Sequence, residues 1–175
     1  PFADQPGAYA SIWSYGHRNP QGLDVDPSTG ELWETEHGPR GGDETNKIRP
    51  GLNFGWPVIT YGMNYNGSAM TDSTIQEGME QPKHYWVPSI ASCGIDFYEG
   101  NRFYNWKNNL FVSGMASQEL HRLTIKDGEV VDDEIILKNQ GRVRDVASGP
   151  GGYLYVSLTS GTPAKGSIYR LVPAK

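Results

Sequence analysis

Two arginines, Arg142 and Arg144, are the residues of this 175-residue chain that most clearly suggest chemistry. They lie in a stretch typical of a β-strand, where side chains two positions apart share one face and are about 6.5–7 Å from each other. Guanidinium groups this close repel each other unless an anion neutralises them, and their planar shape suits bidentate binding of carboxylates or phosphates. The pair is therefore either a solvated surface pair or a clamp for a ligand that carries several acidic groups.

A glycine-rich, acidic segment at residues 36–46 is the second candidate. It places Gly38 and Pro39 shortly before two carboxylates, Asp43 and Glu44. Glycine and proline leave backbone carbonyls exposed, and oxygen-rich sites without thiols suit Ca²⁺ or Mg²⁺. The spacing is not that of an EF-hand. A tight acidic turn without a metal is the alternative interpretation.

Other chemical signatures are weak. The histidines are scattered and form no zinc-type spacing, so we expect hydrogen-bonded structural roles for them. The chain has no G-x-S-x-G, no Walker-type loop and no G-x-G-x-x-G after a strand, which disfavours hydrolase triads and nucleotide sites. The histidines are His17, His37, His84 and His121.

Composition indicates a turn-rich, aromatic, all-β chain, with 22 Gly, 12 Pro, 10 Tyr and 5 Trp. The net charge of −5 and the absence of a basic run argue against nucleic acid as the main partner. No apolar run is long enough to span a bilayer. The single cysteine, Cys93, excludes an intrachain disulfide and a cysteine metal cluster, and we expect it to be a buried structural thiol.

Three segments repeat one plan of strand, Gly-containing turn and second strand: residues 22–35, 94–113 and 144–157. Further strands are expected at 120–125, 134–137 and 167–172. Leu110 and Leu154 lie 44 positions apart, which fits the roughly 40–45 residues of one four-stranded propeller blade.

Residues 36–90 make the first spacing longer than one blade, and we expect an ordered functional loop there. Its aromatic residues could stack on a flat cofactor or on sugar rings, or pack into the domain's own core. They are Trp56, Tyr61, Tyr65, Tyr85 and Trp86.

The repeats predict a β-propeller of which about three blades are present. A closed ring needs at least four blades, so this chain corresponds to roughly half a propeller. It would close by pairing with a second copy, or it is part of a longer polypeptide. The start at Pro1, without Met or signal peptide, is compatible with a removed leader or with a fragment.

Four motifs in order, residues 13–22, 36–44, 53–57 and 141–146, resemble the soluble aldose sugar dehydrogenases that use pyrroloquinoline quinone (PQQ). This is the glucose/sorbosone dehydrogenase family, and the resemblance runs from about Ile12 to Leu171. It implies a six-bladed β-propeller, with residues 1–175 as a C-terminal portion of that domain. It also implies oxidation of an aldose at C1 to the lactone, in a periplasmic or secreted protein.

The resemblance also implies the residues of the site. The calcium at the cofactor would take the carbonyls of Gly38 and Pro39, and a second, structural Ca²⁺ would take Glu44 and the carbonyl of Phe54. Ser89, Thr159 and Ser160 would lie near other cofactor contacts. The residues that would bind PQQ are Arg18, Asn19, Tyr65, Arg142 and Arg144.

The sequence departs from the family pattern in two ways. Ala116 stands where the family often has a cofactor-binding lysine, so PQQ affinity is lower or Gln118 substitutes. The family's catalytic histidine belongs to the absent N-terminal half, so we expect no catalytic residue in this chain, His17 included. The sequence identifies neither the aldose nor the electron acceptor. The alternative functions are a non-catalytic, self-associating half-propeller that binds sugars, and, disfavoured by the arginines, a structural fragment without a ligand.

Overall fold

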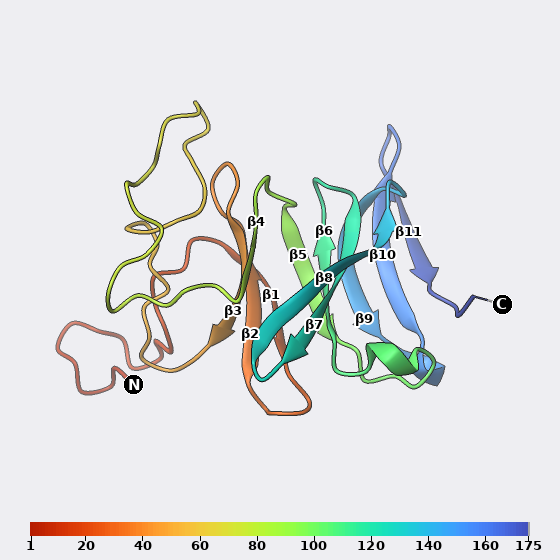
Figure 1. Cartoon of the computed structure of the whole chain (residues 1–175), viewed down its shortest axis with the longest axis horizontal. Coiled ribbons are helices and arrows are strands. Elements are labelled where there is room, and N and C mark those ends of the chain that lie inside the picture. The colour runs from red at the N-terminus through yellow and green to blue at the C-terminus, as the bar shows by residue number, and fades with distance from the viewer. Residues whose placement is uncertain (175) are drawn as a thin grey trace.

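The computed structural model describes residues 1–174, and these form an all-β architecture of three antiparallel sheets with two short 3-10 turns (Figure 1). The first sheet contains β1 (Pro20–Val25), β2 (Leu32–Glu36), β3 (Asp43–Ile48) and β4 (His84–Trp86). The second contains β5 (Ser92–Phe97), β6 (Leu110–Gly114), β7 (Glu119–Lys126) and β8 (Glu129–Lys138). The third contains β9 (Arg142–Ser148), β10 (Leu154–Ser160) and β11 (Lys165–Arg170), while η1 (Tyr104–Trp106) and η2 (Pro150–Gly152) lie in connections. The predicted all-β class is confirmed.

The sheets are arranged like successive propeller blades. Within each sheet the strands follow one another in chain order, and every pairing is antiparallel. The first strand of the second sheet, β5, packs against the first strands of its neighbours, β1 and β9. In each sheet the later strands lie progressively farther from these three first strands. The three sheets lie side by side in Figure 1. Three blade-like sheets therefore match the predicted repeats, while the six-bladed ring remains a prediction.

The hydrophobic core fills the two spaces between the three sheets. Alternating residues of β6 point to opposite faces, as the period of a strand requires. Leu110 and Val112 join the cluster that contains Trp33 of the first sheet, whereas Phe111 joins the cluster that contains Val143 and Val156 of the third. All six side chains are fully buried. The middle sheet is thus covered on both faces, which explains why residues 110–112 of β6 are apolar without interruption.

Two strands were not expected from the sequence. We predicted a continuous loop over residues 36–90, but β3 and β4 lie inside it. The sequence of β3, Asp-Glu-Thr-Asn-Lys-Ile, has a low strand propensity because only Thr45 and Ile48 favour strands. Buried polar contacts of Asp43 and Asn46 hold it in the sheet instead. Residues 49–83 do form a long connection without named strands.

A polar cluster ties the first sheet to the second. Asp133 of β8 accepts hydrogen bonds from Trp86 Nε1 of β4 at 3.0 Å and from the ring of His121 of β7 at 2.7 Å. The ring of His84, also on β4, lies 3.2 Å from the same carboxylate. Burial opposes ionisation, but these donors outweigh it and lower the pKa of Asp133 below its usual range. The ionised carboxylate therefore joins β4, β7 and β8.

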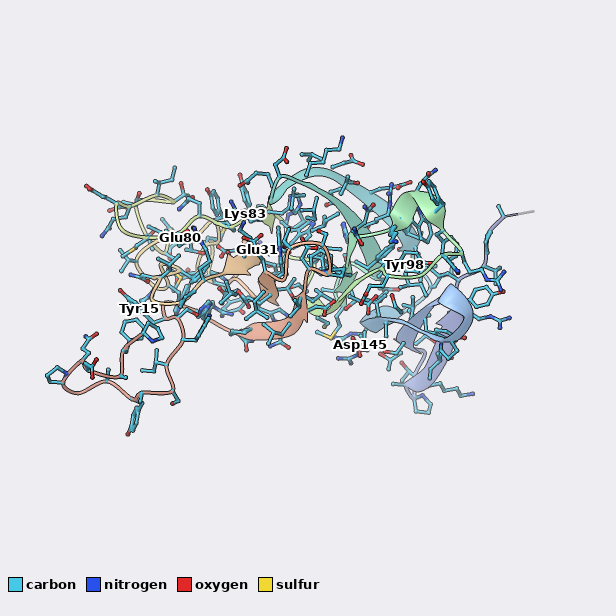
Figure 2. The ribbon with its side chains drawn as sticks, turned by 90° about the horizontal axis from the view of Figure 1, so that it is seen from below. Tyr15, Glu31, Glu80, Lys83, Tyr98 and Asp145 are labelled. Carbon is cyan, nitrogen blue, oxygen red and sulfur yellow. The ribbon has the colours of Figure 1, made fainter. Side chains whose placement is uncertain are left out.

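The ends of the sheets define two rims. The connection between β2 and β3 and the tip of the β10–β11 hairpin both lie at the upper rim in Figure 1. In the third sheet, Arg142 of β9 pairs with Thr159 of β10 near that tip. At the other end of these two strands, Ser148 of β9 pairs with Leu154 of β10. The second rim is the lower one in Figure 1. Figure 2, seen from below, shows Tyr98 beside the 3-10 turn η1 at this lower rim. No helix among the described residues is long and apolar enough to cross a membrane.

Candidate functional site

The two arginines of β9 share one exposed face, as their spacing predicted. Val143 between them is fully buried, while both arginines are exposed. Arg144 Nε donates to Thr159 Oγ1 at 3.2 Å, and its Nη1 lies 2.7 Å from Met115 Sδ. Neither guanidinium forms an ion pair within residues 1–174. The charges of both arginines are therefore available to an external anion.

A hollow of about 420 Å³ opens at this arginine pair. Its walls come from the turn after β8, the start of β9, the β10–β11 hairpin and Gln118 at the start of β7. Gln118 and Asn139 adopt positive φ angles of 57° and 59°, which are uncommon for residues other than glycine. The polar residues that line it are Gln118, Asn139, Gln140, Arg142, Arg144, Thr159 and Ser160. This set places the predicted arginines, Thr159 and Ser160 around one space.

Arg18 and Asn19 lie directly before β1, and the carboxylate of Glu36 binds their backbone N–H groups. Glu36 Oε2 accepts from the backbone N–H groups of Arg18 at 2.5 Å and Asn19 at 3.1 Å. Arg18 Nη1 donates to the carbonyl of His37 at 3.1 Å, and its guanidinium lies 5.2 Å from the Trp56 ring centroid. Arg18 Nε is buried without a partner among the described residues. Such an unsatisfied donor fits an anionic ligand.

The loop between β2 and β3 folds tightly around Gly38. A Cβ atom at this position would lie 2.2 Å from the carbonyl oxygen of Gly42, so only glycine fits. Gly38 donates its N–H to Asp43 Oδ1 at 3.0 Å, and Gly41 donates to Ser89 Oγ at 3.0 Å. No hydrogen bond from residues 1–174 reaches the carbonyl of Gly38 or of Pro39. These two carbonyls therefore have their acceptor capacity free, as a calcium site needs.

Glu44 and Phe54, the residues predicted for the second calcium, line one small cavity of about 10 Å³ together with Arg18, Glu36 and Gly38. That is about the space that one water molecule or ion occupies. Glu44 lies on β3, not in a loop as we expected, and pairs in register with Glu36. Burial, followed by the negative charge of Glu36, raises the pKa of Glu44 to about 8. A cation in this cavity would favour the ionised carboxylate.

A buried acidic cluster behind these residues was not predicted. Glu34 and Glu36 alternate on β2, and both are nearly inaccessible, at 2% and 3% exposed. Their register partners on β3 are Asn46 and Glu44. The Asn46 side-chain amide donates to all three carboxylates, at 3.0 Å for Glu34 and 3.3 Å for Glu36 and Glu44. The two glutamates two apart in Glu34-Thr35-Glu36 were the available signal, because on a strand they share a face.

His17 is the positive partner of this cluster. Its Nδ1 lies 3.7 Å from Glu34 Oε1 and 3.6 Å from Glu36 Oε1, which is ion-pair rather than hydrogen-bond distance. Burial disfavours the charged ring, but the two carboxylates outweigh it and raise the pKa of His17 to about 9. Burial also raises the pKa of Glu34. The imidazolium compensates only part of the negative charge gathered here.

The other predicted residues differ in their surroundings. Tyr65 is 74% exposed and lines neither the hollow at Arg142 nor the cavity at Glu44. Cys93 is half-buried rather than buried, and burial raises the pKa of its thiol. His37, His84 and His121 contact a backbone carbonyl or carboxylates, which fits the structural roles predicted for them.

A larger hollow, of about 800 Å³, lies elsewhere, at the opposite rim near η2. It is lined by Glu99, Arg102, Ser148 and glycines, and Arg102 Nε already donates to the carbonyl of Gly151 at 2.9 Å. None of the residues proposed for the cofactor lines it. Size alone therefore does not mark the site.

Residues 1–170 match the profile of a family described as Glucose / Sorbosone dehydrogenase. The chain belongs to this family. It is 44% identical over 159 residues to the aldose sugar dehydrogenase YliI of Escherichia coli K12, and the match covers 89% of this chain and 43% of YliI. A solved glucose dehydrogenase is similar over the whole chain, with 44% identity, a TM-score of 0.91 and 50% of its own length covered.

A second solved structure is the PQQ-bound aldose sugar dehydrogenase of Streptomyces coelicolor, with 26% identity and a TM-score of 0.70. The match covers 93% of this chain and 47% of that protein. The chain thus spans about half the length of the relatives it matches. The family and the sugar dehydrogenase likeness predicted from the four motifs are confirmed.

Proposed function

We propose that this chain is the cofactor- and calcium-binding part of a PQQ-dependent aldose sugar dehydrogenase, which oxidises an aldose at C1 to the lactone. The observation that carries the proposal is the pair Arg142 and Arg144, which lacks ion-pair partners among the described residues and faces a hollow of about 420 Å³. Two unneutralised cations on one face call for a ligand with several acidic groups. Family membership and the PQQ-bound Streptomyces relative support PQQ as that ligand.

The chemistry of PQQ fits the residues present. It is a planar tricarboxylate, and when bound it would supply the two-electron acceptor for the oxidation of the sugar. Arg142 and Arg144 would neutralise carboxylates, and Thr159 and Gln118 line the same hollow. Arg18, with its unpartnered Nε, and Asn19 would add contacts from the first sheet. Tyr65, whose side chain is exposed, would cover the plane of the cofactor.

Two calcium ions fit the remaining predicted residues. The carbonyls of Gly38 and Pro39 accept no hydrogen bond from the described residues and would hold the ion beside the cofactor. Glu44 and the carbonyl of Phe54 would hold a second ion in their shared cavity. All of these ligand atoms are oxygens, as Ca²⁺ prefers.

The base that takes the proton of the sugar hydroxyl would come from the other half of the enzyme. Each histidine of this chain is engaged with a carboxylate or a backbone carbonyl of the described structure. We therefore assign no catalytic residue to this chain. The electron acceptor is not identified by any residue here, and the periplasmic or secreted location remains a prediction.

The outer faces of the half-ring support a partner. Leu23 on β1 is 66% exposed and Ile168 on β11 is 75% exposed, at the two ends of the row of sheets. A covering N-terminal half would bury them, and so would a second copy of this chain. The second copy corresponds to the alternative function, a non-catalytic half-propeller that binds sugars.

Reconstitution tests the proposal. The chain is combined with PQQ, Ca²⁺ and glucose, and reduction of a dye is followed with and without an N-terminal half taken from a relative. We expect dye reduction only in the completed protein. A completed protein that binds PQQ but reduces no dye with any aldose would contradict the proposed activity. A stable dimer of the chain that binds no PQQ would favour the alternative.

A further inference from the structure

We propose that His17, Glu34 and Glu36 form a binding site for a divalent transition-metal ion, with zinc-like ligand preference, beside the proposed second calcium position, whose cavity Glu36 also lines. One ring nitrogen and one oxygen from each carboxylate all lie within 4.8 Å of one another. The ligands come from the segment before β1 and from β2, two parts of the chain that the first sheet brings together. This inference does not depend on PQQ binding or on sugar oxidation.

The cluster contains atoms without partners. His17 Nδ1 and Glu34 Oε2 are both buried, and neither has a hydrogen-bond partner among residues 1–174. Glu34 is 98% shielded from solvent, since only 2% of its surface is exposed. Buried polar atoms are nearly always satisfied in folded proteins. An ion that binds His17 Nδ1 and the Glu34 carboxylate would satisfy them.

The spacing suits metal ligands better than hydrogen bonds. His17 Nδ1 lies 3.7 Å from Glu34 Oε1 and 3.6 Å from Glu36 Oε1. Ligands at about 2.0–2.1 Å from a tetrahedral zinc ion lie about 3.4 Å from each other. Small side-chain rotations would therefore bring the three atoms onto one ion, with solvent or the second Glu34 oxygen as a fourth ligand.

The ring of His17 is oriented for this role. Its Nε2 lies 2.8 Å from Ser14 Oγ, and its face stacks on Phe54 with 4.7 Å between ring centroids. When the serine hydroxyl accepts from Nε2–H, the lone pair of Nδ1 points to the carboxylates. Histidine ligands of metals are held by such a hydrogen bond through their other nitrogen.

Charge supplies the driving force. Glu34, Glu36 and Glu44 converge on the single amide of Asn46. The ion pairs of Glu34 and Glu36 in the described chain are both with His17. A dication would compensate the buried negative charge more fully than one proton on the ring does. Imidazole together with carboxylates suits Zn²⁺ and its neighbours, whereas Ca²⁺ prefers ligands that are all oxygen.

The ion would act on the cofactor residues through Glu36. Glu36 would bind the metal through Oε1, while its Oε2 holds the backbone N–H groups of Arg18 and Asn19. A fixed carboxylate would keep both residues in place at the start of β1. The metal would thus have a structural role that supports the proposed cofactor contacts.

Calorimetric titration of the metal-free chain with Zn²⁺ alone tests the proposal. We expect one site, and at least tenfold weaker binding in His17→Gln and in Glu34→Gln. Glu80→Gln and His84→Gln are the matched controls, because Glu80 pairs with Arg49 on the surface and His84 faces a carboxylate elsewhere. Both controls should bind Zn²⁺ within about twofold of the unchanged chain. The absence of one-to-one binding, or an equal loss in either control, would overturn the proposal.

X-ray absorption at the zinc edge of the unchanged chain provides a readout that does not depend on the folding of any variant. We expect a first shell of nitrogen and oxygen with one imidazole. A sulfur ligand would assign the ion to Cys93, and two or more imidazoles would assign it to other histidines. Either result would overturn the site at His17, Glu34 and Glu36.

Discussion

Glu36 Oε2 lies 2.5 Å from the backbone nitrogen of Arg18 and accepts its N–H. The same oxygen accepts from Asn19, so one buried carboxylate sets the backbone of both residues that the family motif assigns to the cofactor. Hydrogen bonds to an ionised acceptor are about twice as strong as neutral ones. The backbone of Arg18 and Asn19 is thus held by a buried carboxylate on β2, the strand that pairs with β1.

The substitution Glu36→Gln should separate this positioning role from folding. It keeps the shape but removes the charge, so we expect the free energy of unfolding to fall by about 1–3 kcal/mol. We also expect PQQ affinity to fall several-fold, measured by quenching of tryptophan fluorescence. Glu31→Gln, which removes a partly exposed pair with Lys47, is the control and should cost less than about 1 kcal/mol. Reduced stability with unchanged PQQ affinity would limit Glu36 to a role in the fold.

Arg142→Ala and Arg144→Ala should each weaken PQQ binding by about tenfold or more, because each removes a charged hydrogen-bond donor worth about 1.5–3 kcal/mol. Binding to the unchanged chain should also weaken as salt is added, since the pair is exposed. Titrations at low and high salt measure both effects. Arg170→Ala removes an exposed arginine that lies 4.7 Å from the Tyr153 ring, and it should leave affinity unchanged. Equal losses in all three variants would show that the effect is not specific to the pair.

Calcium should stabilise the chain through Glu44. An ion at 100 times its dissociation constant adds about 2.7 kcal/mol to the free energy of unfolding, so the melting temperature should rise with Ca²⁺. Glu44→Gln should abolish the part of this rise that is due to the second calcium. Glu80→Gln, which removes a surface pair with Arg49, should respond to Ca²⁺ like the unchanged chain. A Glu44→Gln variant with the full response would place the ion elsewhere.

The sequence predicted the regular part of the fold because apolar strands and turns follow local rules. Turn residues such as Pro27-Ser28-Thr29-Gly30 separate runs that became β1 and β2. It failed at β3, where pairing with β2 and buried hydrogen bonds of Asp43 and Asn46 override a low strand propensity. Propensity is only a prior that tertiary contacts replace.

The candidate site divides in the same way. The period of a strand predicts that Arg142 and Arg144 share a face. That neither arginine has an ion-pair partner among the described residues follows only from the three-dimensional structure. The cluster of His17 with Glu34 and Glu36 joins segments 17 residues or more apart, and no local pattern brings them together. The register of β2 with β3 and the course of the segment before β1 bring these three residues together.

Asp133 should make the stability of the chain sensitive to acid. Because hydrogen bonds from His121, Trp86 and the neighbouring His84 lower the pKa of this carboxyl, its contribution is present above its unfolded value of about 3.9 and is lost as the pH falls below it. Asp133→Asn should therefore reduce the free energy of unfolding by about 1–3 kcal/mol at pH 7. The difference from the unchanged chain should shrink towards pH 3, as urea unfolding at pH 7, 5 and 3 would measure. Asp132→Asn, an exposed neighbour on β8, is the control and should match the unchanged chain at every pH. A deficit of Asp133→Asn that stays constant down to pH 3 would show that the carboxylate's charge does not join the first two sheets.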